Sequence, residues 1–111
     1  MNLDQLIDLV NEFRDEREWR KFHNPKDLAI SISLEAAELL ENFQWIDSES
    51  ALNGRRENVE QEIADVLIYC LMLSSDLDLD PSEIIRNKIE LNQEKYPVEK
   101  AKGSARKYTE F

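Results

Sequence analysis

The sequence has few of the residues that disulfide-rich or β-sheet proteins depend on. Cys70 is the only cysteine, so an intramolecular disulfide is excluded. Two glycines and three prolines leave little turn chemistry for hairpins, and no alternating apolar pattern predicts strands. The longest uncharged apolar run, Val66 to Leu73, is far shorter than the roughly 20 residues that cross a bilayer. These absences favour an all-α fold and no membrane partner.

Basic side chains are also in the minority. Against 24 acidic residues there are 14 basic ones, and the 111-residue chain carries a formal net charge of −10. A protein that binds a nucleic-acid backbone needs a basic face, so we expect no nucleic-acid partner. The N-terminal residues MNLDQLIDLV lack the basic region and continuous apolar core of a signal peptide, so we expect a cytoplasmic protein.

The length predicts one helical catalytic domain, residues 1–97, followed by a basic C-terminal tail, residues 98–111. The tail has more basic than acidic side chains, unlike the rest of the chain. Two interpretations of it remain open: a solvated tail that favours solubility, or an arm that folds over an anionic ligand.

Capping residues and helical spacing predict four helices. Asn2 with Gln5 resembles a capping box, Asn24-Pro25 is a cap followed by proline at the first helical position, and Asp80-Pro81 repeats that signal. The predicted segments are a first helix from Asn2, a second from Asn24 to about Phe43, a loop from Gln44 to Arg56, a third helix from about Glu57 to Leu77, and a fourth from Asp80 to about Tyr96, ended by Pro97.

Two of these helices carry paired carboxylates on otherwise apolar surfaces. Glu35 and Glu38 share a narrow polar stripe of the second helix, and Glu62 and Asp65 share one on the third. A helix that is apolar nearly all round is buried nearly all round. In so short a chain, we therefore expect the second apolar face to pack against another subunit.

Four carboxylates in one confined site repel one another and cannot all stay ionised without compensation. Solvated edges or pairs with Lys and Arg are the ordinary alternative for such residues. A hard divalent cation compensates them better here, and Mg²⁺ prefers oxygen ligands and substrate phosphates, with Mn²⁺ as the alternative ion. A di-iron bundle is excluded because it needs Glu-x-x-His pairs and His23 is the only histidine.

Residues suited to a nucleotide accompany the acidic residues. Lys88, Asn92 and Tyr96 are spaced four apart on the predicted fourth helix, so they share a side. Lys88 is either a structural ion-pair partner or a point charge for phosphate, and Asn92 offers amide donors. Aromatic residues around Trp19, His23 and Trp45 flank the second helix, as part of the core or as surfaces for a base.

These residues together resemble a known family. Glu35-Ala-Ala-Glu38 followed by Glu62-Ile-Ala-Asp65 is similar to the E-x-x-E…E-x-x-D signature of the all-α MazG-like nucleoside triphosphate pyrophosphohydrolases. Leu34 stands where longer members carry a further Glu, which fits the short, single-domain branch that includes the dCTP pyrophosphatases. The resemblance covers about residues 13 to 97 and includes the segments 22–28, 41–45, 65–69 and 88–97.

The resemblance implies a four-helix bundle that assembles as a tight dimer or a dimer of dimers. It implies Mg²⁺-dependent hydrolysis of a (deoxy)nucleoside triphosphate to monophosphate and diphosphate, a house-cleaning activity with a dCTP or modified dCTP preference. Glu35, Glu38, Glu62 and Asp65 would then hold the metal, Glu35 or Glu38 would direct the water, and Lys88 would steady the phosphates. By the same resemblance, Trp19, His23 and Trp45 would enclose the base, and Asn92 and Tyr96 would contact sugar or phosphates.

Two other functions fit parts of the sequence. Helices that are apolar all round also occur in non-catalytic interaction modules, which would require no metal. A nucleotide-sensing regulator could keep the pocket and lose turnover. The interaction module gives no reason for Glu62 and Asp65 to stand beside an apolar run, and the presence of all four acids disfavours a regulator that has lost turnover, so an enzyme is the favoured hypothesis.

Overall fold

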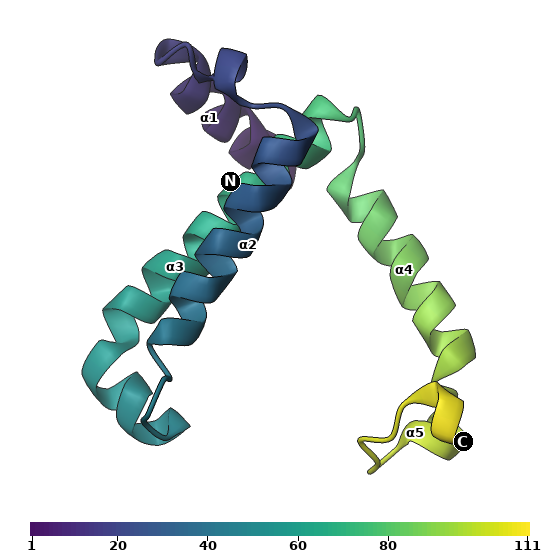
Figure 1. Cartoon of the computed structure of the whole chain (residues 1–111). Coiled ribbons are helices and arrows are strands. Elements are labelled where there is room, and N and C mark those ends of the chain that lie inside the picture. The colour runs from purple at the N-terminus through teal and green to yellow at the C-terminus, as the bar shows by residue number, and fades with distance from the viewer. The chain divides into compact units, whose positions relative to one another are not determined.

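The computed structural model describes all residues, 1–111, and is entirely helical (Figure 1). Its elements are α1 (Leu3–Glu16), the 3₁₀ turn η1 (Trp19–Phe22), α2 (Pro25–Glu41), α3 (Ser48–Asp76), α4 (Pro81–Lys95), the short α5 (Val98–Ala101) and the 3₁₀ turn η2 (Tyr108–Glu110). The predicted all-α class with four main helices is confirmed. The chain divides into two compact units, residues 1–78 and 79–111.

Side-chain caps begin the helices at the predicted positions. Asn2 accepts from the Gln5 amide at 2.9 Å while its own amide donates to Gln5 Oε1 at 2.9 Å, which is a complete capping box. Asn24 accepts from the Asp27 amide at 2.8 Å, and Asp80 accepts from the Ser82 amide at 2.9 Å. Each cap satisfies an amide that the first helical turn leaves unpaired.

The predicted loop from Gln44 to Arg56 is wrong over most of its length. Asp47 caps a helix by accepting from the Ser50 amide at 2.8 Å, and α3 begins at Ser48. Arg55 departs from helical geometry, with φ −129° and ψ 21°, so α3 is kinked there. The polar residues of this segment therefore begin a helix and bend it, and the bend precedes the part of α3 that carries Glu62 and Asp65.

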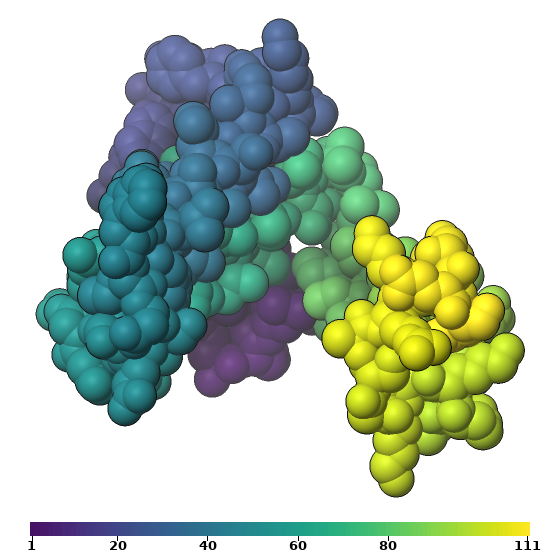
Figure 2. All heavy atoms as spheres, turned by 60° about the horizontal axis from the view of Figure 1, so that its bottom comes forward, coloured from purple at the N-terminus to yellow at the C-terminus, as the bar shows by residue number.

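The first unit is built on the packing of α2 along α3, with α1 against the C-terminal part of α3 (Figures 1 and 2). Val10, Leu28 and Met72 form its buried core, one residue from each of these helices. Ile68, Tyr69, Leu71 and Leu73 of α3 pack against that core. This arrangement fixes α2 and α3 side by side at the positions of the acidic residues.

Much apolar surface of the first unit has no partner within it. Ile30 and Leu34 of α2 are 46% and 59% exposed, and Ile63 and Leu67 of α3 are 43% and 57% exposed. The second apolar face that the sequence predicts for α2 is therefore present and uncovered. None of the helices is long and apolar enough to pass through a membrane.

In the second unit, the C-terminal residues fold back on the end of α4 (Figure 2). The Tyr96 ring forms T-shaped contacts with the rings of Tyr108 and Phe111, with centroid separations of 5.8 Å in both pairs. The Lys95 ammonium lies 5.0 Å from the Tyr108 ring centroid. These aromatic contacts hold the basic tail against the helix from which it emerges.

Candidate active site

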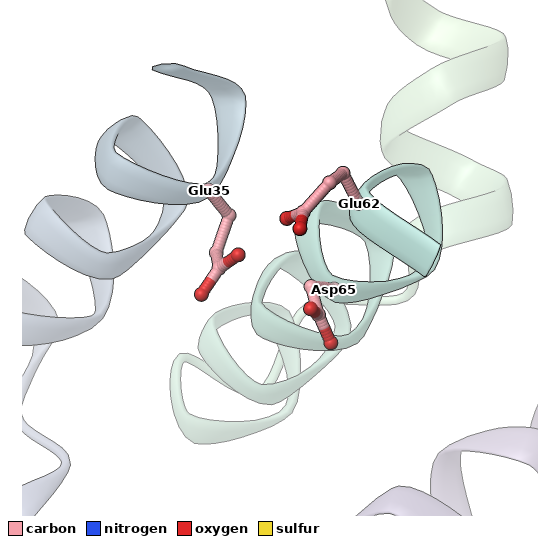
Figure 3. A group of neighbouring side chains, drawn as sticks. All are labelled: Glu35, Glu62 and Asp65. Carbon is pink, nitrogen blue, oxygen red and sulfur yellow. The ribbon is translucent and has the colours of Figure 1, made fainter. Parts of the chain in front are cut away.

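Three acidic side chains meet between α2 and α3. Glu35 of α2 faces Glu62 and Asp65 of α3, and one carboxylate oxygen from each lies within 4.8 Å of the others (Figure 3). Glu62 and Asp65 share a face of α3 because they are three residues apart, and the packing of α2 supplies the third carboxylate. Three of the four predicted metal ligands are thus brought together.

Two oxygens of this cluster are buried without a hydrogen-bond partner: Glu35 Oε2 and Glu62 Oε2. A buried polar atom without a partner is costly, and buried carboxylates are normally paired or bound to a metal. Carboxylate oxygens at this spacing are the donor set that a hard divalent cation takes. The residues present therefore fit a bound divalent metal ion.

The electrostatics of the cluster agree with that fit. Burial, then hydrogen bonding with Glu38 and Glu62, raises the pKa of Glu35 to about 7. Burial and the neighbouring Glu38 and Asp65 raise the pKa of Glu62 as well. Carboxylates held this close favour sharing a proton or a cation over full ionisation.

Glu38 stands one turn further along α2. It is exposed and lies outside the group of three, but its charge contributes to the raised pKa values of Glu35 and Glu62. Together with Glu62 it lines a polar cavity of about 710 Å³ that extends toward the kink at Arg55. Glu38 is therefore placed beside the cluster, where a fourth ligand or a group that orients water would lie.

On the other side of the cluster is an apolar cavity of about 630 Å³ between α1 and the α2–α3 pair. Glu35 and Asp65 line it together with apolar and aromatic side chains: Leu6, Leu9, Val10, Phe13, Trp19, Ile68, Tyr69 and Met72. The cavity combines an aromatic surface with two carboxylates at one site. This is the arrangement expected of a pocket that takes a flat, partly apolar ligand.

Tyr69 and Phe13 are site residues that the sequence reasoning did not select. Tyr69 follows Asp65 by one helical turn, so its ring lines the same cavity, and burial followed by the charge of Glu35 raises its pKa. The i, i+4 spacing from Asp65 is the signal that could have identified it. The Phe13 ring makes a T-shaped contact with Trp19, with a centroid separation of 5.5 Å.

The predicted aromatic residues lie at two separate places. Trp19 lines the apolar cavity, and His23 meets the Trp19 ring edge-to-face with centroids 6.3 Å apart. Trp45 follows α2 at its opposite end, is 95% exposed and has a left-handed backbone with φ 65°. Lys88, Asn92 and Tyr96 belong to the second unit, where Lys88 and Asn92 are exposed, and their roles stay predictions.

A profile of the MazG-like family matches residues 30–111, which include the acidic cluster and the C-terminal segment. The chain belongs to the MazG-like family. Curated relatives include dCTP pyrophosphatase 1 of Homo sapiens, which is 36% identical over 98% of this chain and 67% of that protein. The protein of the same name from Bos taurus is 35% identical over 98% of this chain and 68% of that protein. A pyrophosphatase crystal structure from Archaeoglobus fulgidus is 49% identical, with a TM-score of 0.81 over 86% of this chain and 92% of that one.

These relatives confirm the predicted MazG-like family and the predicted enzyme class, nucleoside triphosphate pyrophosphohydrolase. The two non-catalytic alternatives, an interaction module and a sensor without turnover, find no support among them. The relatives are themselves named as pyrophosphatases.

Proposed function

We propose that this MazG-like enzyme hydrolyses a (deoxy)nucleoside triphosphate to the monophosphate and diphosphate, with Mg²⁺ as its metal. One observation carries the proposal: the carboxylate cluster holds two unpartnered buried oxygens, on Glu35 and Glu62, and its members Glu35 and Asp65 line a cavity that also contains aromatic rings. The first feature suits a divalent cation and the second suits a nucleobase. A nucleoside triphosphate is a ligand that requires both.

Glu35, Glu62 and Asp65 would hold the Mg²⁺, with Glu38 as the fourth carboxylate. When bound, the metal would supply neutralising charge for the phosphates and lower the pKa of a bound water. Glu35 or Glu38 would orient the water toward the α-phosphorus. The new bond joins the water oxygen to that phosphorus, and the bond to the bridging oxygen breaks, so that diphosphate leaves with that oxygen.

Lys88 would place a point charge on the phosphates and offset the negative charge that develops on the departing diphosphate. Asn92 and Tyr96, one and two turns further along α4, would contact the sugar or the phosphates. The aromatic contacts of Tyr96 with Tyr108 and Phe111 would hold its ring in one orientation for that contact.

Trp19, His23 and Trp45 would enclose the base. His23 precedes α2 and Trp45 follows it, and this helix of 17 residues is about 25 Å long at about 1.5 Å per residue. A single chain therefore cannot apply both residues to one base. We propose that Trp45 of a second copy completes the pocket, in a dimer or a dimer of dimers whose interface covers the exposed apolar residues Leu34 and Leu67.

Replacing Trp45 with alanine should raise KM for the nucleotide about tenfold while kcat and Mg²⁺ affinity change little. Loss of one stacked base contact costs roughly 1–3 kcal/mol, and Trp45 is not one of the side chains that would hold the metal. Steady-state kinetics measure this split, with Trp45→Phe as a control that keeps an aromatic ring. An unchanged KM in the alanine variant would remove Trp45 from the base site.

The names of the curated relatives favour dCTP as the substrate. A modified dCTP as a further substrate, and removal of unwanted nucleotides from the cellular pool as the role, are our own extension of that proposal. A panel of NTPs and dNTPs, including dCTP and a methylated dCTP, tests this with purified protein and Mg²⁺ or Mn²⁺. We expect monophosphate and diphosphate as products, formed fastest from the cytosine deoxynucleotides. Orthophosphate as the first product would overturn the proposed reaction.

A further inference from the structure

A buried charged pair lies apart from the acidic cluster, at the meeting point of α1, η1 and α3. The Arg14 side chain is completely buried, with 0% exposure. Its Nη1 donates to Asp76 Oδ2 at 3.0 Å, and its Nη2 donates to Asp76 Oδ1. This two-point contact between a guanidinium and a carboxylate joins residues 62 positions apart in the chain.

Further hydrogen bonds fix the orientation of the guanidinium. Arg14 Nε donates to Asn11 Oδ1 at 3.0 Å, and Asn11 Nδ2 donates to Ser75 Oγ at 3.0 Å. Arg20 adds a donor to Asp76 Oδ1 at 3.2 Å. The pair is therefore held from α1, from η1 and from α3, and the Arg14 plane has no freedom to turn.

The second hydrogen of Arg14 Nη1 is directed to His23, whose Nδ1 lies 3.5 Å away. An arginine side chain has only donors, so the imidazole nitrogen beside it must present a lone pair. In a neutral histidine the proton then resides on Nε2. His23 is half-buried, and the edge-to-face contact with Trp19 holds its ring in place.

We infer that Arg14, itself anchored by Asp76, is a positioning residue that holds His23 in the neutral tautomer with its hydrogen on Nε2. His23 then offers the substrate one donor of fixed direction, suited to a nucleobase carbonyl oxygen or an unprotonated ring nitrogen. The contact with substrate rests on the proposed function, whereas the assignment of the His23 tautomer is independent of it.

The charges around His23 agree with the geometry. Burial first, and then the Arg14 cation, lowers the pKa of His23 from the usual 6.5, with Arg20 acting in the same direction. The Asp76 carboxylate acts in the opposite direction. These groups come from α1, η1 and α3, the elements packed around the imidazole, and their balance favours the neutral form at physiological pH.

Nitrogen and carbon NMR of the imidazole tests the tautomer directly, because His23 is the only histidine and gives a single set of signals. In the full-length wild type we expect a protonated Nε2, an unprotonated Nδ1 and a pKa below 6.5. A protonated Nδ1 in the neutral form, or rapid exchange between both tautomers, would overturn the inference.

Two substitutions should shift the His23 titration in opposite directions. Arg14→Met removes the cation and should raise the pKa of His23, whereas Asp76→Asn removes the opposing carboxylate and should lower it. General loosening of the fold would move the pKa of His23 in both variants toward the usual 6.5. Asp76→Asn also keeps the test available if Arg14→Met fails to fold, and shifts of the same sign in both variants would contradict the inference.

Kinetics test the donor itself. A glutamine amide reaches the place of histidine Nε2, and an asparagine amide reaches that of Nδ1. We expect KM of His23→Asn to be about tenfold above that of His23→Gln, with similar kcat in the two variants, because only the asparagine variant loses the hydrogen bond to the substrate. Equal KM values in the two variants would overturn the donor role. Absence of turnover by the wild type with every triphosphate would instead refute the proposed function and leave the NMR result standing.

Discussion

Glu35→Gln and Glu62→Gln should each reduce kcat by about 1,000-fold, with the helical content and oligomeric state unchanged. Each substitution preserves the shape of the side chain but removes a negative charge from the group of three carboxylates. Because Glu35 Oε2 and Glu62 Oε2 have no partner in the protein, the amide replacements break no existing hydrogen bond of those atoms. The loss would therefore report on metal binding and on the orientation of water.

Glu60→Gln is the matched control on the same helix. Glu60 is exposed and pairs with Arg56 at 3.3 Å, one turn away, where a surface ion pair contributes little. Turnover of this variant should stay within about twofold of the wild type, since the charge change is the same and only the position differs. Turnover by Glu35→Gln or Glu62→Gln at the level of this control would contradict the metal-site assignment.

Without metal, the melting temperature should fall as the pH is raised from about 5 to about 8. The pKa of Glu35 is about 7 in the folded chain against a reference value of 4.5, so between these values the folded protein retains a proton that the unfolded chain has released. This contribution to stability is complete below pH 4.5 and is lost as the pH rises through about 7. The raised pKa of Glu62 acts in the same direction.

Mg²⁺ should reverse this trend, because a divalent cation replaces the proton as the partner of the ionised carboxylates. We therefore expect the melting temperature at about pH 8 to rise with Mg²⁺ concentration, since a ligand that binds only the folded state stabilises it. Thermal unfolding at a series of pH values, with EDTA or with Mg²⁺, measures both effects. Glu35→Gln is the control that separates both effects from the general charge repulsion within an acidic chain. In this variant the melting temperature should depend less on pH.

A melting temperature that rises with pH in EDTA, or one that Mg²⁺ leaves unchanged, would contradict the electrostatic account of the cluster. The same measurements with nucleotide added would show whether the apolar cavity contributes further stabilisation.

Local signals in the sequence predicted the helix starts at Asn2, Asn24 and Asp80, because capping depends on residues within one turn of each other. The same chemistry operates at Asp47, which caps α3 although Ser48 to Gly54 are mostly polar residues typical of a loop. Such residues also suit a first helical turn. Composition alone therefore predicts a loop where the cap begins a helix.

The pairing of Glu62 with Asp65 follows from helical spacing, and so it was predictable. The position of Glu35 beside them depends on how α2 packs on α3. The sequence suggested that packing because a simple bundle places two largely apolar helices side by side, and the family resemblance pointed the same way. The network of Arg14, Asp76 and His23 had no sequence signal at all, because its members come together only when α1 and η1 meet the end of α3. Contacts between distant segments are set by tertiary packing, and local patterns do not encode them.

Hydrolysis in ¹⁸O-labelled water tests whether the carboxylate site directs water to the α-phosphorus of a nucleoside triphosphate. Mass spectrometry of the products from dCTP and Mg²⁺ shows which fragment receives the label. We expect one ¹⁸O atom in the monophosphate and none in the diphosphate. Label in the diphosphate would place the attack at the β-phosphorus, and label in orthophosphate would place it at the terminal phosphate. Either result would refute attack at the α-phosphorus.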